Sequence, residues 1–358
     1  MKILKQISLI ICIGLLLYFC YLLRKNLKIT EKYNENFNGI ENFNDNFNVN
    51  DIDIVITWVE NTPKLQKERE EWLNKGGYSR PSDARYTDNE EMKYLLRSIE
   101  KHFPNYRYIY IVIKDDQFPK YLKPELKNNT TRLKIIKHSD IIPKEYLPTF
   151  NSRAIEMYLH HIKGLSEYYI YANDDFIFTK DTDRSYYIDP NGKPYVLLTN
   201  DSVHPDTNKN LNLGGNGFKC GLAYNSKILD KMTKREKRYE VPHCPMMYKK
   251  SYDFKIEKNF KKYFPDHDKN NNYFDKTGAA KFRRCDDLYF VSLIKPYFYK
   301  NLYNCEEKDS DTTIINSYNK EININTRFIC VEDILTNNFE KYKKFMDNLF
   351  PQKTIYEI

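Results

Sequence analysis

Several features that would define a protein class are missing from this 358-residue sequence. Of its seven cysteines, two lie within residues 7–23 and the others form no C-x-x-C pair, which argues against a zinc site. The net charge of +8 is spread along the chain without a dense basic block, and no zinc-finger or RNA-binding signature is present. We therefore expect no nucleic acid partner. The Gly214–Gly217 segment lacks the G-x-G-x-x-G spacing of a dinucleotide-binding loop, so we interpret it as a turn.

The N-terminal part of the chain contains a charge-free run over residues 7–23. As a helix rising about 1.5 Å per residue, this run would span roughly 26 Å, at the short end of what crosses a bilayer. No A-x-A-like cleavage site follows it, so we favour a transmembrane anchor over a cleaved signal peptide. Basic residues flank both ends, so charge does not decide its orientation. We interpret residues 1–6 as a short tail and 24–50 as an Asn-rich polar stalk.

Strand-like and helix-like segments alternate from Asp51 onward. The predicted strands cover residues 52–59, 108–113, 133–136 and 168–172, and the predicted helices cover residues 89–102 and 151–162. This alternation predicts an α/β domain with a largely parallel sheet and flanking helices. Ligands of such sheets bind at the carboxyl ends of the strands. Further along, residues 257–276 predict a solvated insertion, and residues 339–350 predict an amphipathic helix that packs on the domain.

The Asn173-Asp174-Asp175 triplet stands at the end of the fourth predicted strand. Two adjacent carboxylates are a poor choice for packing but a good choice for a divalent cation, because Mg²⁺ and similar ions prefer oxygen ligands and share their shell with substrate phosphates. The alternative is a strand end with solvated acids. The triplet is our first candidate for a functional site.

Three other segments contain residue types suited to chemistry. Arg85 can bind phosphate oxygens through its guanidinium fork, whereas Asp88 and Asn89 can instead cap the following helix. His243 lies between two prolines, where it is either structural or a proton acceptor. Arg283 lies near a pair of acids, either as part of a surface ion pair or as a phosphate clamp beside a metal ligand.

The order and spacing of these segments resemble the Stealth family of sugar-phosphate transferases. That family includes bacterial capsule polymerases and the α/β subunit precursor of the lysosomal-enzyme N-acetylglucosamine-1-phosphotransferase. The matching motifs are D-I-V-x-T-W-V at Asp53–Val59, R-x-x-D-N-x-E-L-x-x-x-L-R-S at Arg85–Ser98 with Met92 for Leu, L-P-T-F-N-S-x-A-I-E at Leu147–Glu156, L-x-N-D-D at Tyr171–Asp175, H-x-P at His243–Pro245 and F-R-x-x-[DE]-D at Phe282–Asp287. Where the family has W-V-D-G, this chain has Glu60 and Asn61, so the carboxylate is kept with a longer reach.

The resemblance implies a Rossmann-like fold of the GT-A type that binds a nucleotide sugar. It also implies transfer of a hexose 1-phosphate, such as N-acetylglucosamine 1-phosphate, from a UDP-sugar to a glycan hydroxyl with release of UMP. The expected cofactor is a divalent metal, Mg²⁺ before Mn²⁺ or Ca²⁺. The roles we assign are metal binding by Asp174, Asp175 and Asp287, catalysis by His243, Arg283 and the Asp174–Asp175 pair, and donor binding by Asp53, Trp58, Glu60, Arg85, Asp88 and Asn89.

The resemblance also implies a single-pass membrane protein whose catalytic domain faces the secretory lumen. We place that domain at residues 51–335, with an insertion at 257–280 and a C-terminal helix and tail at 336–358. Two other functions remain open. A metal-dependent glycosyltransferase would use the same donor but release UDP, and a glycan-binding membrane protein would catalyse nothing.

Overall fold

The computed structural model describes residues 51–199, 202–203, 217–230, 238–239, 241–264, 272–316, 324–332 and 339–358. All of them belong to one compact unit, Asn48–Ile358. The predicted anchor at 7–23, the stalk at 24–50 and most of the Gly214–Gly217 turn lie outside the described residues. Among the described residues, no helix has the length and apolar character needed to cross a membrane.

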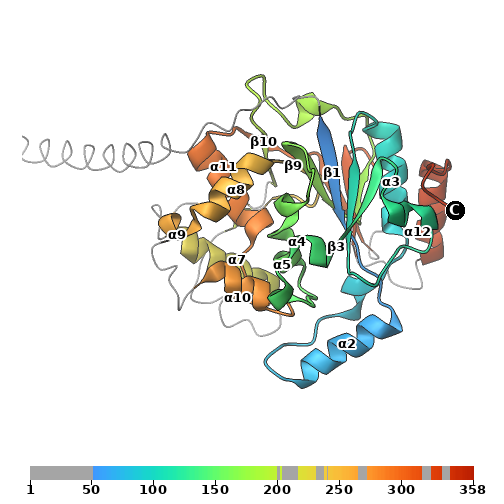
Figure 1. Cartoon of the computed structure of the whole chain (residues 1–358). Helices are drawn as coiled ribbons and strands as arrows, with labels where there is room; N and C mark the ends of the chain where they lie inside the picture. The colour runs from blue at the N-terminus through green and yellow to red at the C-terminus, as the bar shows by residue number, and fades with distance from the viewer. Residues whose placement is uncertain are drawn as a thin grey trace, which may run out of the picture. The chain divides into compact units, whose positions relative to one another are not determined.

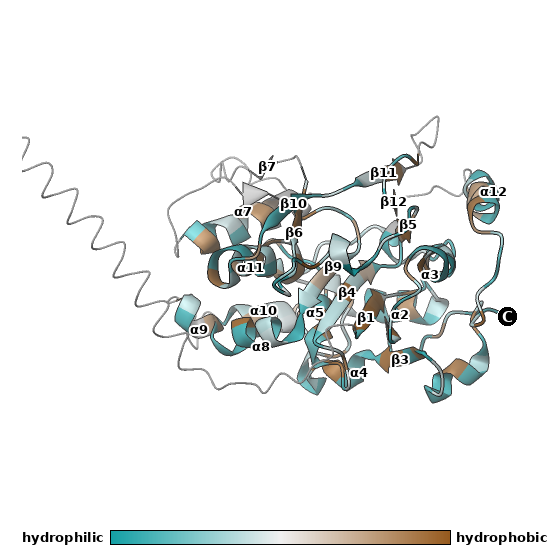
Figure 2. Cartoon of the chain, turned by 90° about the horizontal axis from the view of Figure 1, so that it is seen from above, coloured by the Kyte–Doolittle hydropathy of each residue, from teal (hydrophilic) through white to brown (hydrophobic). Residues whose placement is uncertain are grey.

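The main sheet has five strands in the order β3-β2-β1-β4-β9. Its strands are β1 (Ile52–Thr57), β2 (Ile109–Ile113), β3 (Leu133–Lys137), β4 (Tyr168–Asn173) and β9 (Met246–Lys249). Strands β1 to β4 are parallel, and β9 pairs antiparallel with β4 at one edge. The predicted α/β class with a largely parallel sheet is therefore confirmed. The central strand β1 is hydrophobic (Figure 2) and buried along almost its whole length, as a strand covered on both faces should be.

Helices cover the sheet on two sides (Figure 1). One side carries α3 (Glu91–His102) and α12 (Phe339–Leu349), while the other carries α7 (Gly217–Asp230), α8 (Lys250–Lys258), α9 (Phe260–Tyr263), α10 (Tyr273–Ala279) and α11 (Lys295–Tyr303). The remaining helices are α2 (Pro63–Asn74), α4 (His138–Ile141) and α5 (Ser152–Glu156). Helix α12 buries Tyr342 and Met346, which confirms the C-terminal helix that the sequence predicts.

A three-stranded sheet, β11-β12-β5, extends the fold beyond the Asp174–Asp175 turn. It contains β5 (Phe176–Phe178), β11 (Thr312–Asn316) and β12 (Phe328–Glu332). The short strands β6 (Val196–Leu198) and β10 (Glu307–Asp309) pair with each other, as do β7 (Ser202–Val203) and β8 (Arg238–Tyr239). In the β5–β12 pair Cys330 lies opposite Phe176, and the Val331 amide donates to the Asp175 carbonyl over 3.0 Å. The end of β12 is thereby held beside the Asp pair.

Two predictions about segments that follow residue 150 are wrong. The helix expected over 151–162 ends at Glu156 and is followed by a separate turn of 3₁₀-helix over Leu159–His161, whose two histidines hydrogen-bond to Glu257 of α8. The segment expected as a solvated insertion at 257–280 instead contains α9 and α10, and it buries Phe260, Tyr263, Phe264 and Tyr273. The segment packs into the fold through its aromatic side chains, whereas its Lys, Asn and Asp residues had suggested that it lies at the surface.

A buried ion pair fixes the C-terminal tail to α3. The Arg97 Nε donates to Glu357 Oε1 over 3.0 Å and its Nη2 donates to Oε2 over 2.6 Å, with both side chains at most 6% exposed. Removing Glu357 leaves the buried Arg97 charge with only the partly exposed Asp347 carboxylate, 3.6 Å away, and the Phe350 carbonyl.

We expect Glu357→Ala to lower the free energy of unfolding by about 3–5 kcal/mol. Glu307→Ala serves as the control, because Glu307 pairs with Lys300 at the surface, where both side chains are at least one-third exposed, and should cost at most about 1 kcal/mol. Urea denaturation followed by tryptophan fluorescence measures both values. Equal midpoints for the two variants would show that the tail is not anchored by this pair.

Candidate functional site

The carboxyl edge of the main sheet gathers most of the polar side chains that the sequence indicates. Asp174 and Asp175 form the turn between β4 and β5, and Trp58 follows β1 directly. His243 lies on the segment leading into β9, which runs antiparallel to β4. Because β1 and β4 are parallel and in register, their carboxyl ends meet at this edge. Asp88 lies just before α3, which packs against β5.

Four carboxyl groups crowd together here. Burial raises the pKa of Asp174 well above its ordinary value, and the charges of Asp175, Glu91 and Asp88 raise it further. Burial and the charge of Glu91 also raise the pKa of Asp175 to about 7, although His243 opposes the shift. The pKa of Asp88 rises to about 7 from burial and from Glu91. Such shifts show that the site disfavours so much negative charge unless a cation compensates for it.

Several polar atoms of the site have no hydrogen-bond partner among the described residues although they are buried. They are Asp175 Oδ1 and the hydroxyls of Tyr121 and Tyr342, whereas the Trp58 indole faces the Asp88 carboxylate, where a hydrogen bond opposes the rise of the Asp88 pKa. Buried polar atoms are normally paired, so unpaired ones indicate an absent ligand, ion or water. The carboxylate oxygens are the donors that Mg²⁺ and Mn²⁺ take. The chemistry of these oxygens therefore suits a divalent cation, although among the described residues no three of these carboxylates bring their oxygens within 4.8 Å of one another.

Asn89 and Glu91 form a small unit at the start of α3. The Asn89 backbone N–H and its Nδ2 donate to the two Glu91 carboxylate oxygens over 2.7 and 2.8 Å. Burial nonetheless raises the pKa of Glu91. The structure thus gives Asn89 the role of orienting an acid that sequence reasoning left without a role, although Glu91 is the acid of the R-x-x-D-N-x-E-L motif.

His243 is oriented by an acid from a distant part of the chain. Its Nδ1 lies 2.6 Å from Glu332 Oε1, and both side chains are partly exposed, at 42% and 34%. The hydrogen bond to His243 is the main reason why the pKa of Glu332 is lowered. The Cys330 thiol lies 3.9 Å from the same Nδ1 and 3.6 Å from Asp175 Oδ2. With Nδ1 bonded to Glu332, Nε2 is the ring nitrogen that can accept a proton from a substrate.

A group of arginines lies on another side of the edge. Arg283 donates to Ser152 Oγ over 2.6 Å, and its charge acts on the buried Glu156. The Tyr171 hydroxyl donates to Glu156 Oε1 over 3.4 Å, which connects this group to β4. Arg85 is exposed, and its charge and that of Arg283 both act on the Tyr86 hydroxyl. The two arginines proposed as phosphate clamps therefore act on one common side chain, Tyr86.

Glu60 stands where the family has Asp, and it lies at the rim of the candidate site. The Gln117 side-chain amide binds its backbone at both the N–H and the carbonyl, and its carboxylate lies 3.4 Å from Lys120 Nζ. The longer side chain thus reaches a lysine, while its charge still contributes to the raised pKa of Asp88.

The contacts of Asp287 involve its own loop and residues near Asn151 rather than the Asp pair, so they do not support its assignment as a third metal ligand. One of its oxygens, Oδ2, accepts from Asn151 Nδ2 over 2.9 Å and from the Arg284 amide over 2.7 Å. Its nearest cation is Arg153, at 3.7 Å. Asp287 holds its own loop in place, and the carboxylates that act on Asp174 and Asp175 are Asp88, Glu91 and Glu332.

Asp53 is also corrected, because it lies at the amino end of β1, a full strand away from Trp58. Its carboxylate is fully buried and accepts from Arg107 Nε over 2.9 Å, from Arg107 Nη2 over 2.5 Å, and from the Tyr108 and Ser166 amides. With these partners Asp53 ties β1 to its neighbours and takes no part in donor binding.

We therefore expect Asp53→Asn to act on stability rather than on catalysis. The variant should lose about 3 kcal/mol of unfolding free energy, since it leaves the Arg107 guanidinium without its charged partner. The KM for the donor should stay within about twofold of the wild type, a change of less than 1 kcal/mol. Thermal unfolding and steady-state kinetics below the unfolding temperature test this. A raised KM with an unchanged Tm would restore Asp53 to the donor site.

Comparison with known proteins gives the same family as the motifs. The family model described as Stealth protein CR2, conserved region 2, matches residues 85–196. The capsular polysaccharide phosphotransferase fcs1 of Haemophilus influenzae is 31% identical over 253 residues, which cover 69% of this chain and 64% of the relative. LcbA of Neisseria meningitidis, also named a capsular polysaccharide phosphotransferase, is 36% identical over 157 residues, 42% of each chain. This chain thus spans less than two-thirds of the length of these relatives.

Among solved structures, two of LgtC align with this chain at 9% identity. The first is a galactosyltransferase in complex with donor and acceptor sugar analogs; its alignment covers 83% of this chain and 95% of the LgtC chain, with a TM-score of 0.39. The second is an active-site mutant; its alignment covers 85% of this chain and 98% of the LgtC chain, with a TM-score of 0.37.

The matched region contains the acids and the amide that form the centre of the site. Asp88, Asn89 and Glu91 lie near its start, and Asp174 and Asp175 lie further along it. By its motifs, its matched region and its relatives, the chain belongs to the Stealth protein family.

Proposed function

We propose that this protein transfers a hexose 1-phosphate from a UDP-sugar to a hydroxyl group of a glycan. The observation that carries the proposal is the juxtaposition of the buried, unpaired Asp175 Oδ1 with the His243–Glu332 pair at one sheet edge. The relatives named as capsular polysaccharide phosphotransferases support the same class of reaction. Within that class, N-acetylglucosamine 1-phosphate is the group that we propose first.

Asp174 and Asp175 would hold a divalent cation, with Asp88 or Glu91 contributing a further oxygen. When bound, the cation supplies charge compensation for the diphosphate and its leaving group. Arg85 and Arg283 would bind phosphate oxygens, because a guanidinium binds such oxygens in a bidentate manner. The Trp58 indole N–H faces the Asp88 carboxylate and would orient it toward the cation.

In the reaction that we propose, His243 Nε2 accepts the proton of the acceptor hydroxyl while Glu332 holds Nδ1. The acceptor oxygen forms a bond to the β-phosphorus, and the bond between that phosphorus and the bridging oxygen breaks. UMP leaves with the electron pair, and the product is a sugar–phosphate–sugar diester. Phosphoryl transfer of this kind needs positioning and charge compensation more than covalent catalysis.

A donor labelled with ³²P in its β-phosphate tests the proposal. The full-length protein, Mg²⁺, a panel of UDP-sugars and glycan acceptors should give label in the acceptor and unlabelled UMP. Label in free UDP would assign the protein to the glycosyltransferases that move the sugar without its phosphate. No consumption of any donor, with glycan binding retained, would assign it to the non-catalytic class.

We also propose that residues 7–23 anchor the protein and that its catalytic domain faces an oxidising lumen. The disulfide between Cys220 and Cys285 supports this location, because disulfides persist in oxidising compartments. Protease protection of the domain in sealed microsomes would agree with it, and digestion without detergent would contradict it.

A further inference from the structure

A second group of metal-ligating side chains lies away from the site described above. It consists of His160 and His161 on the 3₁₀ turn after α5 and Glu257 near the end of α8. His160 Nε2 lies 2.7 Å from Glu257 Oε2, and His161 Nε2 lies 2.9 Å from the same oxygen. The three ligand atoms all lie within 4.8 Å of one another. Two imidazoles and a carboxylate form a donor set that Zn²⁺ takes in proteins.

The spacing of these atoms is close to what a tetrahedral ion requires. Zn–N and Zn–O bonds of about 2.0–2.1 Å place the ligand atoms of a tetrahedron roughly 3.3 Å apart. The His–Glu separations of 2.7 and 2.9 Å therefore need to widen by only about half an ångström.

The packing of the cluster also favours a bound ion. The His160 ring is completely buried, and its Nδ1 has no partner among the described residues, so Nε2 carries its polar contact.

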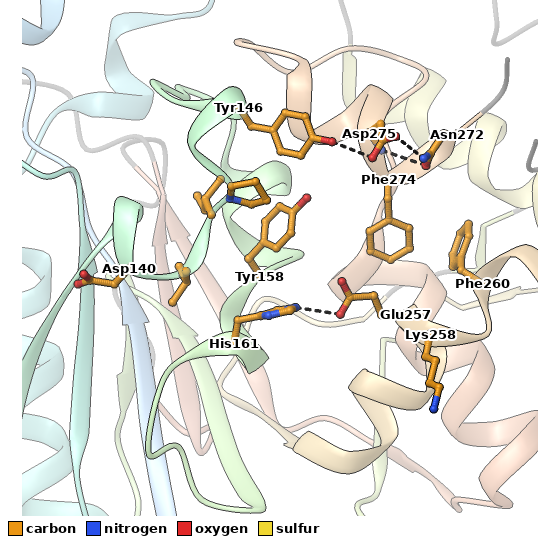
Figure 3. A pocket seen from close by; sticks show the side chains of 13 residues that line it. Asp140, Tyr146, Tyr158, His161, Glu257, Lys258, Phe260, Asn272, Phe274 and Asp275 are labelled. Carbon is orange, nitrogen blue, oxygen red and sulfur yellow. Dashed lines mark hydrogen bonds and ion pairs between the residues drawn. The ribbon is translucent and has the colours of Figure 1, made fainter. Parts of the chain in front are cut away.

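A cavity opens next to these ligands. Its volume is about 480 Å³, and His161 and Glu257 are among the residues that line it. Figure 3 shows both side chains in contact with each other at the wall of this cavity, facing Tyr158 and Phe274. Three protein ligands leave one tetrahedral position, and a position on the cavity side is accessible to water or to an oxygen ligand.

We propose that His160, His161 and Glu257 bind one Zn²⁺ ion whose fourth position faces the cavity. No short sequence motif predicts this site, because the glutamate follows the adjacent histidines by about a hundred residues and no cysteine takes part. The site shares no ligand with the proposed Mg²⁺ site, and its two imidazoles and one carboxylate differ in donor type from that group of carboxylates.

Co²⁺ is the probe for the test, because its visible absorption reports imidazole ligands and low coordination numbers. Chelator-treated full-length protein in excess Mg²⁺ should bind one equivalent of Co²⁺, with visible bands that one equivalent of Zn²⁺ removes. His161→Gln should lower the affinity at least tenfold and abolish the bands. This variant should fold, because the His161 side chain is one-third exposed, and circular dichroism confirms that it has. His243→Gln is the matched control and should keep the bands, since it alters the other group, His243, Cys330 and Glu332, that can hold a metal.

Three results would overturn the proposal. They are the absence of Co²⁺ bands in the wild type, equal Co²⁺ affinity in His161→Gln and wild type, and loss of the bands only in His243→Gln. A thermal shift gives a second measurement, since Zn²⁺ should raise the Tm of the wild type and of His243→Gln but not of His161→Gln. If the Co²⁺ test fails, the proposed Mg²⁺-dependent transfer of a sugar phosphate is not affected. If that transfer activity is not found, the Co²⁺ and Zn²⁺ binding measurements still stand.

Discussion

Replacement of Asp175 by asparagine is expected to lower turnover with Mg²⁺ by about 10³-fold. A catalytic cation supplies several kcal/mol of charge compensation, and each 1.4 kcal/mol of barrier is about a factor of ten in rate. Asparagine keeps the shape of the side chain but removes the charge that binds the ion. Steady-state UMP release from the UDP-sugar donor measures the effect.

The same replacement should leave the protein at least as stable as the wild type. Burial and the neighbouring Glu91 already disfavour the ionised form of Asp175, so a neutral side chain relieves repulsion. Lost activity with an undiminished Tm separates a functional role from a structural one. Asp181→Asn is the matched control, because the Asp181 side chain is 93% exposed, and its turnover should stay within about twofold of wild type. Full metal-dependent turnover in Asp175→Asn would remove Asp175 from the site.

Replacement of His243 by alanine is expected to lower kcat by about 10²–10⁴-fold, the usual contribution of a positioned general base. The donor KM should change little, because His243 acts on the acceptor hydroxyl. The His243 side chain is 42% exposed, so free imidazole can enter the space that alanine leaves. We expect added imidazole to restore part of the turnover in proportion to its concentration.

Glu332→Gln provides the companion measurement for this prediction. It should lower kcat less than His243→Ala does, because the imidazole remains and loses only its orienting acid. The double variant should be no slower than His243→Ala, since residues that act as a unit are not additive. Additive losses, or no response to imidazole, would show that the two side chains do not act together as the proposed base.

Local sequence patterns predicted four of the five strands of the main sheet and the acids proposed for the site. Runs of apolar β-branched and aromatic residues identify β1, β2, β3 and β4, because buried parallel strands read as continuous hydrophobic segments. The acids at Asp88, Asp174 and Asp175 could be found because each directly follows or precedes a predicted element. The rule that ligands lie at the carboxyl ends of strands then brought them together.

Residues whose position depends on distant pairing could not be found in this way. Glu332 reaches His243 only because β12 pairs with β5, across more than a hundred residues of sequence. Asp53 was misassigned because a motif that covers a whole strand does not tell which end faces the site, and six residues at about 3.3 Å each separate the two ends. Asp287 was misassigned because an acid beside arginines can equally be a buried loop anchor.

Crystals of the protein soaked with Mn²⁺ and UDP test the central claim most directly, since manganese scatters anomalously. We predict an anomalous peak within bonding distance of the Asp174 or Asp175 carboxylate and of the diphosphate oxygens, with His243 facing the β-phosphate. A diphosphate bound elsewhere, or bound at this edge with manganese absent from both aspartates, would contradict the account.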